Sequence, residues 1–351
     1  MNTPLSLGYH MPAEWEPQEA VWLSWPHNKK FWGDDIPIVE NIYAQFMSAL
    51  QDGQRIRVLV KNKSMARRAR GIIQAEGVLE ERVDFFQIPT QEIYIRDYGP
   101  TFLVNQKTKE KAIVNWKFNA WGGKYPSSLS DDAVPGIMNQ YLNLPAFGPG
   151  IILEGGSIDV NGAGTVLVTE QCLLNDNRNP HLDRTEIKEY LRDYLGVSNI
   201  LWLGKGLFGD DTDGHIDDIA RFVNPTTVVC AYEQDHNDLN YARLKENYER
   251  LKRMKDQNRR PLEIVKLPMA KVESLEHNWT GSNRKPASYC NFYIGNSAVV
   301  VPTFGQDNDS EALRIMQKYF SDRKVIGIES TRMVLDGGTL HCASQQEPKT
   351  P

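Results

Sequence analysis

The chain has 351 residues, of which 40% are hydrophobic and 24% charged, the composition of an ordinary soluble protein with a sizeable core. Its net charge of -5 makes nucleic acid an unexpected partner, and no segment has the pattern of a signal peptide or of a membrane-spanning helix. Its four cysteines are widely spaced without a CxxC pair, which argues against a disulfide framework and a zinc knuckle and fits a reducing cytoplasm.

Hydrophobic periodicity predicts helices and strands that alternate along the chain. The first part is predicted as strand 20–25, helix 36–51, strand 55–60, helix 64–75 and strand 82–88. Then come strand 112–116, helix 131–142, strands 151–153, 157–160 and 165–168, helix 185–195 and strand 199–203. The last part is predicted as strands 219–223 and 227–231, helix 238–255, strands 262–267, 292–294 and 298–302, helix 308–319 and strand 324–328. About five units of a helix with strands follow one another without a low-complexity linker, so we predict a single α/β domain over residues 1–351.

Polar residues beside glycines follow the predicted strands at four places. These are residues 96–100, 154–156, 209–218 and 336–348. Loops at strand ends are where α/β folds place their functional groups. We therefore expect the catalytic side chains of this protein in these four segments.

The candidate catalytic residues are a thiol, an imidazole and three carboxylates: Cys342, His215, Asp97, Glu154 and Asp217. His215 and Asp217 are two residues apart, and on an extended segment they would face the same side. An ionised cysteine is the strongest side-chain nucleophile at neutral pH, and a histidine moves protons in that pH range.

This combination favours a positively charged substrate. Carboxylates near a thiol raise its pKa, so they would hinder attack on a neutral substrate, whereas a cation reverses the effect. A guanidinium is planar, always charged, and offers donors that match two carboxylates. Cys342 would attack its central carbon, and His215 would protonate the departing ammonia and then activate the water that hydrolyses the thiouronium intermediate.

Each signal also has a structural interpretation. Asp97 could form an ion pair with Arg96 at a strand end. The glycines at 155–156 could be a bulge, the acidic residues at 210–218 a solvated loop or a divalent-metal site, and Cys342 the filling of a last buried strand. In an extended run the side chain of His341 would face away from that of Cys342, so we expect a structural role for it.

Six motifs, in this order, resemble one known family. They are Arg96-Asp97-x-Gly99-Pro100-Thr101, Asn119-Ala120-Trp121-Gly122-Gly123, Glu154-Gly155-Gly156, Gly209-Asp210-Asp211-Thr212-Asp213-Gly214-His215-Ile216-Asp217-Asp218, Asn291-Phe292-Tyr293 and Gly337-Gly338-x-x-His341-Cys342-x-x-Gln345-Gln346. From about Met11 to Pro348 the chain resembles the agmatine deiminases, also called Porphyromonas-type peptidylarginine deiminases. No single motif is specific, but the ordered combination is.

The resemblance implies a five-bladed, pseudo-symmetric α/β propeller, the pentein fold of guanidino-group modifying enzymes, with the site in the central channel. It implies Cys342 as the nucleophile, His215 as the acid and base, and Asp97 and Asp217 as clamps on the guanidinium. It also implies that Glu154 orients His215 and touches the guanidinium, and that neither a metal nor an organic cofactor is needed.

The tail of the substrate is expected to lie along an aromatic wall. Tyr94 stands where the family usually has a tryptophan, and with Trp121 it is the expected wall. Gly338 would let the substrate approach the backbone closely, although Asp336 occupies the first place of a usual Gly-Gly-Gly.

Asp210 or Asp211 could bind a distal amine, so the predicted reaction is hydrolysis of agmatine to N-carbamoylputrescine and ammonia, in polyamine metabolism. The nearest alternative is deimination of peptidyl-arginine or free arginine to citrulline. Others are a metal-dependent ureohydrolase that uses His215, Asp211, Asp213 and Asp217, and a guanidine-binding protein without catalysis. The expected partner is a small cationic guanidine in the cytoplasm; no membrane contact is expected, and a homo-oligomer is left open.

Overall fold

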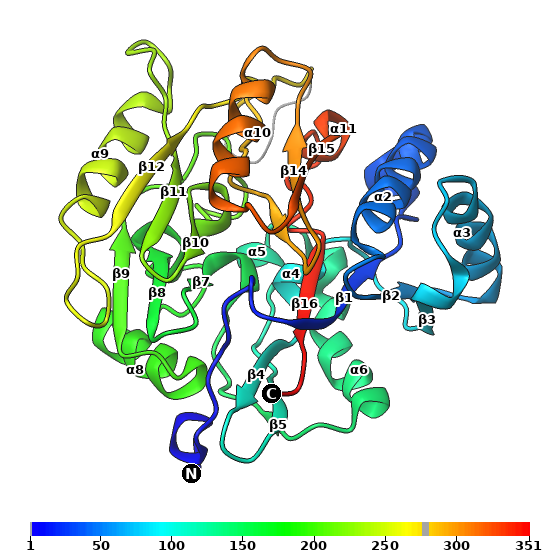
Figure 1. The fold of residues 1–351 in the computed structure, drawn as a ribbon, viewed down its shortest axis with the longest axis horizontal. Helices are drawn as coiled ribbons and strands as arrows, with labels where there is room; N and C mark the ends of the chain where they lie inside the picture. The colour runs from blue at the N-terminus through cyan, green and yellow to red at the C-terminus, as the bar shows by residue number, and fades with distance from the viewer. Residues whose placement is uncertain (1, 276–280) are drawn as a thin grey trace.

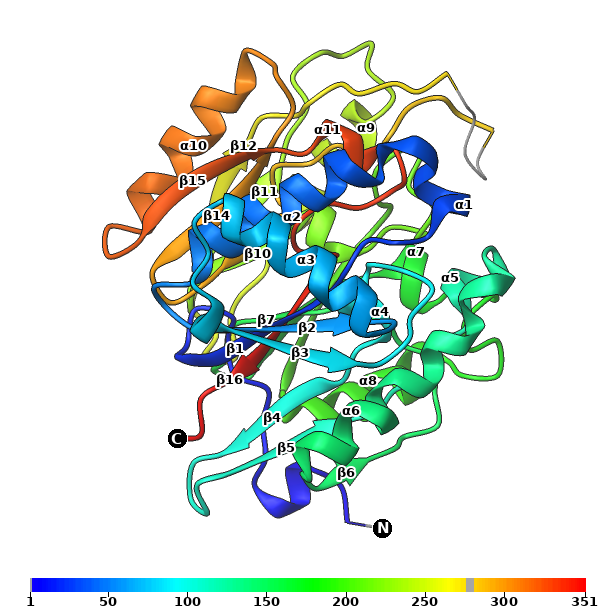
Figure 2. The same ribbon diagram turned by 90° about the vertical axis from the view of Figure 1, so that its right-hand side faces the viewer.

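The strands of the chain form five small sheets, seen from two sides in Figures 1 and 2. The computed structural model describes residues 2–275 and 281–351. Each sheet uses the same order of elements: an antiparallel strand pair, then a helix, then a third strand parallel to the second. A parallel strand needs a crossover connection, and the helix supplies it. The prediction of a mixed α/β fold with about five helix-plus-strand units is confirmed.

The first unit begins with the last strand of the chain, and the other four follow in sequence. The first unit is β16 (Ser344–Pro348), β1 (Gln18–Ser24), α2 (Ile36–Leu50) and β2 (Arg55–Val60), extended by α3 (Lys63–Ala75) and β3 (Val83–Gln87). The second is β4 (Thr101–Asn105), β5 (Glu110–Val114), α6 (Val134–Leu142) and β6 (Ala146–Phe147), and the third is β7 (Asp159–Val160), β8 (Thr165–Thr169), α8 (Arg184–Leu195) and β9 (Asn199–Leu203). The fourth is β10 (Ala220–Asn224), β11 (Thr227–Ala231), α9 (Tyr241–Leu251) and β12 (Glu263–Leu267), and the fifth is β13 (Tyr293–Ile294), β14 (Ala298–Thr303), α10 (Asn308–Tyr319) and β15 (Lys324–Glu329).

Short helices lie in the connections between these elements. The α-helical ones are α1 (Lys29–Trp32), α4 (Ile95–Tyr98), α5 (Ala120–Gly123), α7 (Glu170–Leu173) and α11 (Thr331–Val334). The 3-10 ones are η1 (Leu5–Leu7), η2 (Gly33–Asp35), η3 (Glu80–Arg82), η4 (Pro126–Ala133), η5 (Gly155–Ser157) and η6 (Ile216–Asp218).

The first sheet joins segments from the two ends of the chain. β16 pairs antiparallel with β1, so that Val21 lies opposite Gln346, and Figure 1 shows these two strands crossing the middle of the molecule. Glu347 in β16 accepts hydrogen bonds from Trp22 Nε1 (2.9 Å) and Lys111 Nζ (2.7 Å). Because Lys111 belongs to β5, this buried carboxylate also ties the closing strand to the second sheet.

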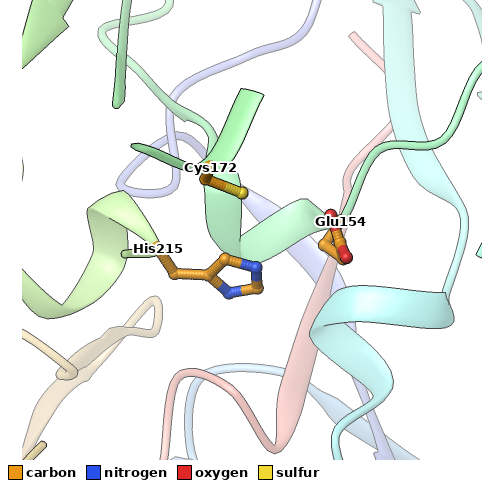
Figure 3. Close-up of side chains that lie close together, drawn as sticks. All are labelled: Glu154, Cys172 and His215. Atoms are coloured by element: carbon orange, nitrogen blue, oxygen red, sulfur yellow. The ribbon is translucent and has the colours of Figure 1, made fainter. Parts of the chain in front are cut away.

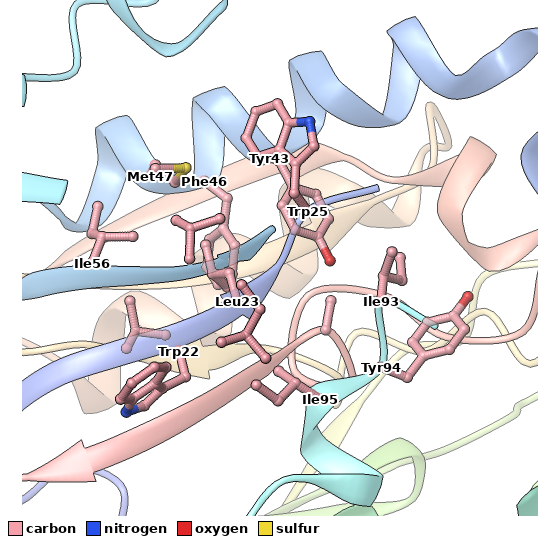
Figure 4. Close-up of a cluster of buried hydrophobic side chains, with 14 of the residues drawn as sticks. Trp22, Leu23, Trp25, Tyr43, Phe46, Met47, Ile56, Ile93, Tyr94 and Ile95 are labelled. Carbon is pink, nitrogen blue, oxygen red and sulfur yellow. The ribbon is translucent and has the colours of Figure 1, made fainter. Parts of the chain in front are cut away.

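Helix α2 packs against the first sheet through a buried apolar face, shown in Figure 4. Tyr43, Phe46 and Met47 have the three- and four-residue spacing of one helix face, and the ring of Tyr43 lies 6.1 Å from that of Trp25. Burying one such side chain contributes roughly 1.5–3 kcal/mol relative to leaving it exposed. The same cluster includes Tyr94, so the core continues into the wall of the pocket described below.

Some predicted elements differ from the structure. The helix predicted at 131–142 begins at Val134, because residues 126–133 form a 3-10 helix. The strand predicted at 151–153 is reduced to one bridge between Lys117 and Ile152. β4 was missed, although β8 and β11, which are equally buried, were predicted. In the described part of the chain, no helix is both long and apolar enough to span a bilayer.

Candidate active site

The site is built from the residues that precede the first strand of each unit. Asp97, Gly156, Asp217, Asn291 and Cys342 stand no more than five residues before β4, β7, β10, β13 and β16, respectively. The short helices at these positions touch, since η5 contacts both α4 and η6. Five segments far apart in the sequence thus meet at one place, at the same end of every unit's first strand.

Three of the predicted catalytic side chains converge on Gly156. A Cβ atom at this position would lie 2.5 Å from His215 Nδ1, 2.7 Å from Asp97 Oδ1 and 3.2 Å from Asp217 Oδ2. The Gly156 N–H donates to Asp97 Oδ1 (3.0 Å), which in turn lies 3.5 Å from His215 Nδ1. Only glycine fits here, and its absent side chain leaves room for one chamber shared by an imidazole and two carboxylates.

The route by which His215 and Asp217 share this chamber differs from the prediction. His215 itself is extended (φ -56°, ψ 141°), but Ile216–Asp218 form a 3-10 helix instead of continuing the extended segment. The two side chains meet because the chain turns between them.

The sulfur of Cys342 faces the same chamber. It lies 3.5 Å from Asp217 Oδ2 and accepts a hydrogen bond from Asn291 Nδ2 (3.0 Å). Asn291 Oδ1 also accepts from the N–H groups of His341 (3.1 Å) and Cys342 (3.3 Å) and therefore fixes the turn that carries the nucleophile. The role of Asn291 was not predicted, although the residue belongs to one of the six motifs; its position before β13, which matches the other four segments, is the signal that marks it.

Arg96 holds the same turn from the other side. Its N–H donates to the carbonyl of Cys342 (3.1 Å), and its guanidinium donates to the carbonyl of His341 (3.3 Å) and to Gln346 Oε1 (2.5 Å). Its ion pair is with Glu14 (3.3 Å), so the structural interpretation of Asp97 as its partner is wrong.

His341 does not face away from the site. The run around it is a turn, in which the Ser344 N–H donates to the His341 carbonyl (3.1 Å), and not an extended strand. Its imidazole bridges Asp217 Oδ2 (2.7 Å) and Glu14 Oε2 (2.9 Å). The expectation of a structural role still fits, because this contact fixes one oxygen of Asp217 and leaves the buried Oδ1 without a hydrogen-bond partner among the described residues.

The electrostatics of the chamber favour the protonated forms of Cys342, Asp97 and His215. Burial raises the pKa of the Cys342 thiol well above its ordinary value, and the carboxylates of Asp217 and Asp218 raise it further. Burial likewise raises the pKa of Asp97 to about 6. Burial alone would lower the pKa of His215, but the adjacent Asp97 carboxylate raises it well above its ordinary value. These shifts favour a neutral thiol and a positively charged imidazole in the free protein.

Cys342 and Asp97 line a pocket with about 510 Å³ of space between its atoms. Both predicted wall residues, Tyr94 and Trp121, also line it, and their ring centroids are 6.2 Å apart. The ring of Tyr125 continues the wall 5.6 Å from that of Trp121. Trp121 Nε1 donates to Asp97 Oδ2 (2.8 Å), so the wall also positions one of the predicted clamp carboxylates.

Gly338 lies between the nucleophile and this aromatic wall. A Cβ atom there would be 3.1 Å from Cys342 Sγ and 2.9 Å from Tyr94 Cε1. Its N–H donates to the Tyr94 hydroxyl (3.3 Å). A side chain larger than hydrogen would therefore not fit at Gly338, and the close approach of the substrate to the backbone there stays a prediction.

Asp210 and Asp211 both line the pocket but differ in their hydrogen bonds. Asp210 accepts from the N–H (2.7 Å) and hydroxyl (2.6 Å) of Thr212 and from the N–H of Gly214 (2.9 Å), so it stabilises its own loop. Asp211 Oδ2 accepts from the Tyr125 hydroxyl (2.8 Å), whereas its buried Oδ1 has no hydrogen-bond partner in the described residues. Of the two, Asp211 offers the free acceptor.

Two further acids line the pocket. Glu92 was not predicted; it is 2% exposed, its Oε1 accepts from Ser128 Oγ (2.7 Å), and burial raises its pKa to about 7. Burial and the nearby Glu92 also raise the pKa of Asp336 well above its ordinary value. The pocket is therefore acidic beyond its inner chamber, which favours a ligand with a second positive charge.

Glu154 is held by Arg178, which the sequence did not single out. Arg178 Nε donates to Glu154 Oε1 (2.6 Å), and Arg178 Nη1 pairs with Asp213 (2.8 Å). Because Asp213 is also paired with Lys124 (2.7 Å), it is not free to bind a metal. Among the described residues, the four ligands expected for a ureohydrolase do not form one metal-binding group.

Comparisons with known proteins identify relatives along the whole chain. The family model described as Porphyromonas-type peptidyl-arginine deiminase matches residues 10–348. The agmatine deiminase of Medicago truncatula is 35% identical, covering 99% of this chain and 98% of that protein. The solved agmatine deiminase of Enterococcus faecalis superposes with a TM-score of 0.92 at 34% identity, covering 100% of this chain and 99% of that one. The C. jejuni agmatine deiminase with substrate bound superposes with a TM-score of 0.87 at 30% identity, covering 97% of each chain. The chain therefore belongs to the Porphyromonas-type peptidyl-arginine deiminase family of amidine C–N hydrolases.

Proposed function

We propose that this protein hydrolyses agmatine to N-carbamoylputrescine and ammonia through a covalent intermediate on Cys342. The observation that carries the proposal is the chamber at Gly156, in which His215, Asp97 and Asp217 converge beside the thiol. The acidic, aromatic-walled pocket suits a guanidinium with a second positive charge at its far end. The relatives named agmatine deiminase support the choice of substrate.

Asp97 and Asp217 bind the guanidinium between them. Two carboxylates match its planar set of N–H donors, and the unpartnered Oδ1 of Asp217 is available to accept from it. The bound cation offsets the repulsion between the carboxylates and lowers the pKa of Cys342, so that the thiol ionises only when substrate is present. This dependence protects the sulfur from reacting without substrate.

In the first half-reaction the Cys342 sulfur forms a bond to the guanidinium carbon. When the substrate binds, the thiol proton passes to solvent, and Asn291 Nδ2, at 3.0 Å, stabilises the negative charge left on the sulfur. His215 delivers a proton to one terminal nitrogen, the C–N bond breaks, and ammonia departs. A positively charged S-alkylthiouronium remains on the enzyme and is held by the same two carboxylates.

In the second half-reaction water replaces the sulfur. His215, now without its proton, takes one from the water, whose oxygen bonds to the same carbon. The C–S bond breaks, the electron pair returns to Cys342 and takes up the remaining hydroxyl proton to restore the thiol, and the carbon keeps the oxygen as the carbonyl of a ureido group. One guanidinium and one water thus give one ureido product and one ammonium ion.

The distal amine of the substrate is assigned to Asp211. Its buried Oδ1 has no hydrogen-bond partner among the described residues, and an ammonium would supply one. Asp210, whose oxygens already accept hydrogen bonds within their own loop, is assigned to loop structure.

Arginine and arginine peptides are poorer fits to this pocket. The carboxylate of free arginine would lie beside Asp211, Glu92 and Asp336, and none of the described residues that line the pocket is an arginine or lysine that could pair with it. All four cysteines are free thiols, which supports the proposal that the enzyme works on a small metabolite in the reducing cytoplasm.

The test is ammonia release from agmatine, arginine and a peptide ending in arginine, measured with the wild type and with Cys342→Ala. We expect agmatine to have the highest kcat/KM and Cys342→Ala to release no ammonia. Equal turnover of the arginine peptide would assign the chain to peptidyl-arginine instead. Release of urea with sensitivity to chelators would identify a ureohydrolase, and binding of agmatine without turnover a silent guanidine-binding protein.

A further inference from the structure

Cys172 is a buried thiol that the proposed mechanism does not use. It lies in α7, and its sulfur, a ring nitrogen of His215 and a carboxylate oxygen of Glu154 all lie within 4.8 Å of one another. Figure 3 shows these three side chains, from three separate segments, around one common space. All three residues are 0% exposed, so the cluster is sealed from bulk solvent by the fold.

The polar atoms of this cluster have unused bonding capacity. Neither ring nitrogen of His215 has a hydrogen-bond partner among the described residues, and the same holds for Glu154 Oε2. Leaving a buried polar atom unpaired costs about 1–3 kcal/mol, and native proteins retain few such atoms without a reason. One ring nitrogen of His215 and one carboxylate oxygen of Glu154 lie within 4.8 Å of the sulfur of Cys172, while His215 Nδ1 also lies 3.5 Å from Asp97 Oδ1.

The donors match one class of ligand. A nitrogen, a sulfur and an oxygen are the usual ligands of Zn²⁺, at about 2.0–2.3 Å each, whereas Mg²⁺ and Ca²⁺ select oxygen alone. Ligands at these distances around a tetrahedral ion stand roughly 3.5 Å apart, which donor atoms within 4.8 Å of one another reach by small side-chain rotations. The three protein ligands leave one position for water.

The charges also allow a divalent cation. Glu154 and Asp213 are paired with the two cations Arg178 and Lys124, so these four charges balance one another. A Cys172 thiolate and the Asp97 carboxylate, which lies 3.5 Å from His215 Nδ1, supply the two negative charges that balance the metal. Binding would release the thiol proton of Cys172, and any proton on the coordinating nitrogen of His215, to solvent.

We propose that Glu154, Cys172 and His215 form a site for a thiophilic divalent cation, with Zn²⁺ as its natural probe. Occupancy of the site stops deimination, because the metal takes a ring nitrogen that His215 needs for proton transfer. A second group within 4.8 Å, made of Asp217, Asp218 and Cys342, contains the nucleophile and is the competing location for a metal.

Removal of the nucleophile separates the two locations. The full chain with Cys342→Ala should bind one Zn²⁺ in equilibrium dialysis with metal analysis. Adding Cys172→Ala should weaken that binding by more than the roughly 10- to 100-fold that loss of an outer-shell partner costs. With Co²⁺ as a spectroscopic probe, Cys342→Ala should show a sulfur-to-cobalt charge-transfer band that the Cys172→Ala double variant lacks. The matched control adds Cys230→Ala to Cys342→Ala. It removes another buried thiol and should retain the band.

The proposal fails if Cys342→Ala binds no metal, or if the Cys172→Ala double variant binds it as tightly. Circular dichroism checks that each variant is folded, and Cys172→Ser, which keeps the size and polarity of the side chain, replaces Cys172→Ala if the latter does not fold. The inhibitory role is tested separately on active enzyme. Half-inhibition of Cys172→Ser should need at least tenfold more Zn²⁺ than that of the wild type, and equal inhibition overturns this role. Because metal binding is read without turnover, its outcome does not depend on agmatine being the substrate.

Discussion

Asn291→Asp tests the assignment of this side chain as the donor that stabilises the sulfur. The change replaces Nδ2 by an oxygen of nearly equal size, so the hydrogen bond to Cys342 Sγ (3.0 Å) and that to Asp218 Oδ1 (3.0 Å) are both lost, while Oδ1 still accepts from the turn. A hydrogen bond to a charged group contributes roughly 1.5–3 kcal/mol, so kcat/KM should fall roughly 10- to 150-fold. The new carboxylate also raises the pKa of Cys342, which should slow its alkylation by iodoacetamide at fixed pH.

Ammonia release from agmatine, alkylation rate and thermal melting are compared for Asn291→Asp and for Asn247→Asp. The control, Asn247 in α9, is buried too, but its amide bonds the backbone of Gly204 and Lys205 directly after β9, so this variant should lose stability and keep kcat/KM. If folded Asn291→Asp keeps kcat/KM within about threefold of the wild type, donation to the sulfur does not contribute to catalysis and the reasoning is refuted.

Three further changes test the chamber, the pocket and the distal site. Gly156→Ala places a Cβ 2.5 Å from the imidazole, so kcat/KM should fall by more than about 100-fold, whereas Gly136→Ala, whose Cβ meets nothing within 4 Å, should leave it unchanged. Burial raises the pKa of Glu92 to about 7. Between about pH 4.3 and pH 7 the folded state therefore keeps a proton on this carboxyl that the unfolded state has lost. Because of this difference, Glu92 destabilises the folded state increasingly as the pH rises to about 7. Glu92→Gln should therefore raise Tm at pH 8 and leave it unchanged at pH 4; equal shifts at both pH values would contradict this sign. Asp211→Asn should raise KM for agmatine at least about tenfold and Asp210→Asn much less, while KM for butylguanidine, which has no amine, should not respond to Asp211→Asn.

Much of the site was visible in the sequence because its groups lie in short motifs. Cys342, His215 and Asp97 stand beside glycines after apolar strands, and glycines mark places where the backbone turns or packs closely. The structure brings all three to one chamber. Asn291 was not predicted as a site residue because an asparagine has no acid–base chemistry of its own, and only the repeated order of elements gives its position a meaning.

The backbone conformation of short segments was harder to predict than the identity of the site residues. Over three residues, a 3-10 turn and a strand have the same pattern of polar and apolar letters, so the backbone after His215 and around His341 was taken as extended. Glu14 and Arg178 were not predicted as site residues. Their ion-pair partners lie far away in the sequence or in another motif, and a buried ion pair leaves no pattern in the neighbouring residues. The pairing of β16 with β1 could not be predicted from local patterns either, since it joins residues more than 300 positions apart.

The strand that closes the first sheet is also the one that follows the nucleophile. A ribosome makes β16 after every other strand, and the turn that carries Cys342 gains its contacts with Arg96 and Asn291 only when this last segment docks against β1. A nascent or truncated chain that lacks residues 344–348 therefore has no assembled reaction centre. Proteolytic loss of the eight residues 344–351, which include β16, would therefore disrupt the reaction centre without removing any side chain that lines the pocket.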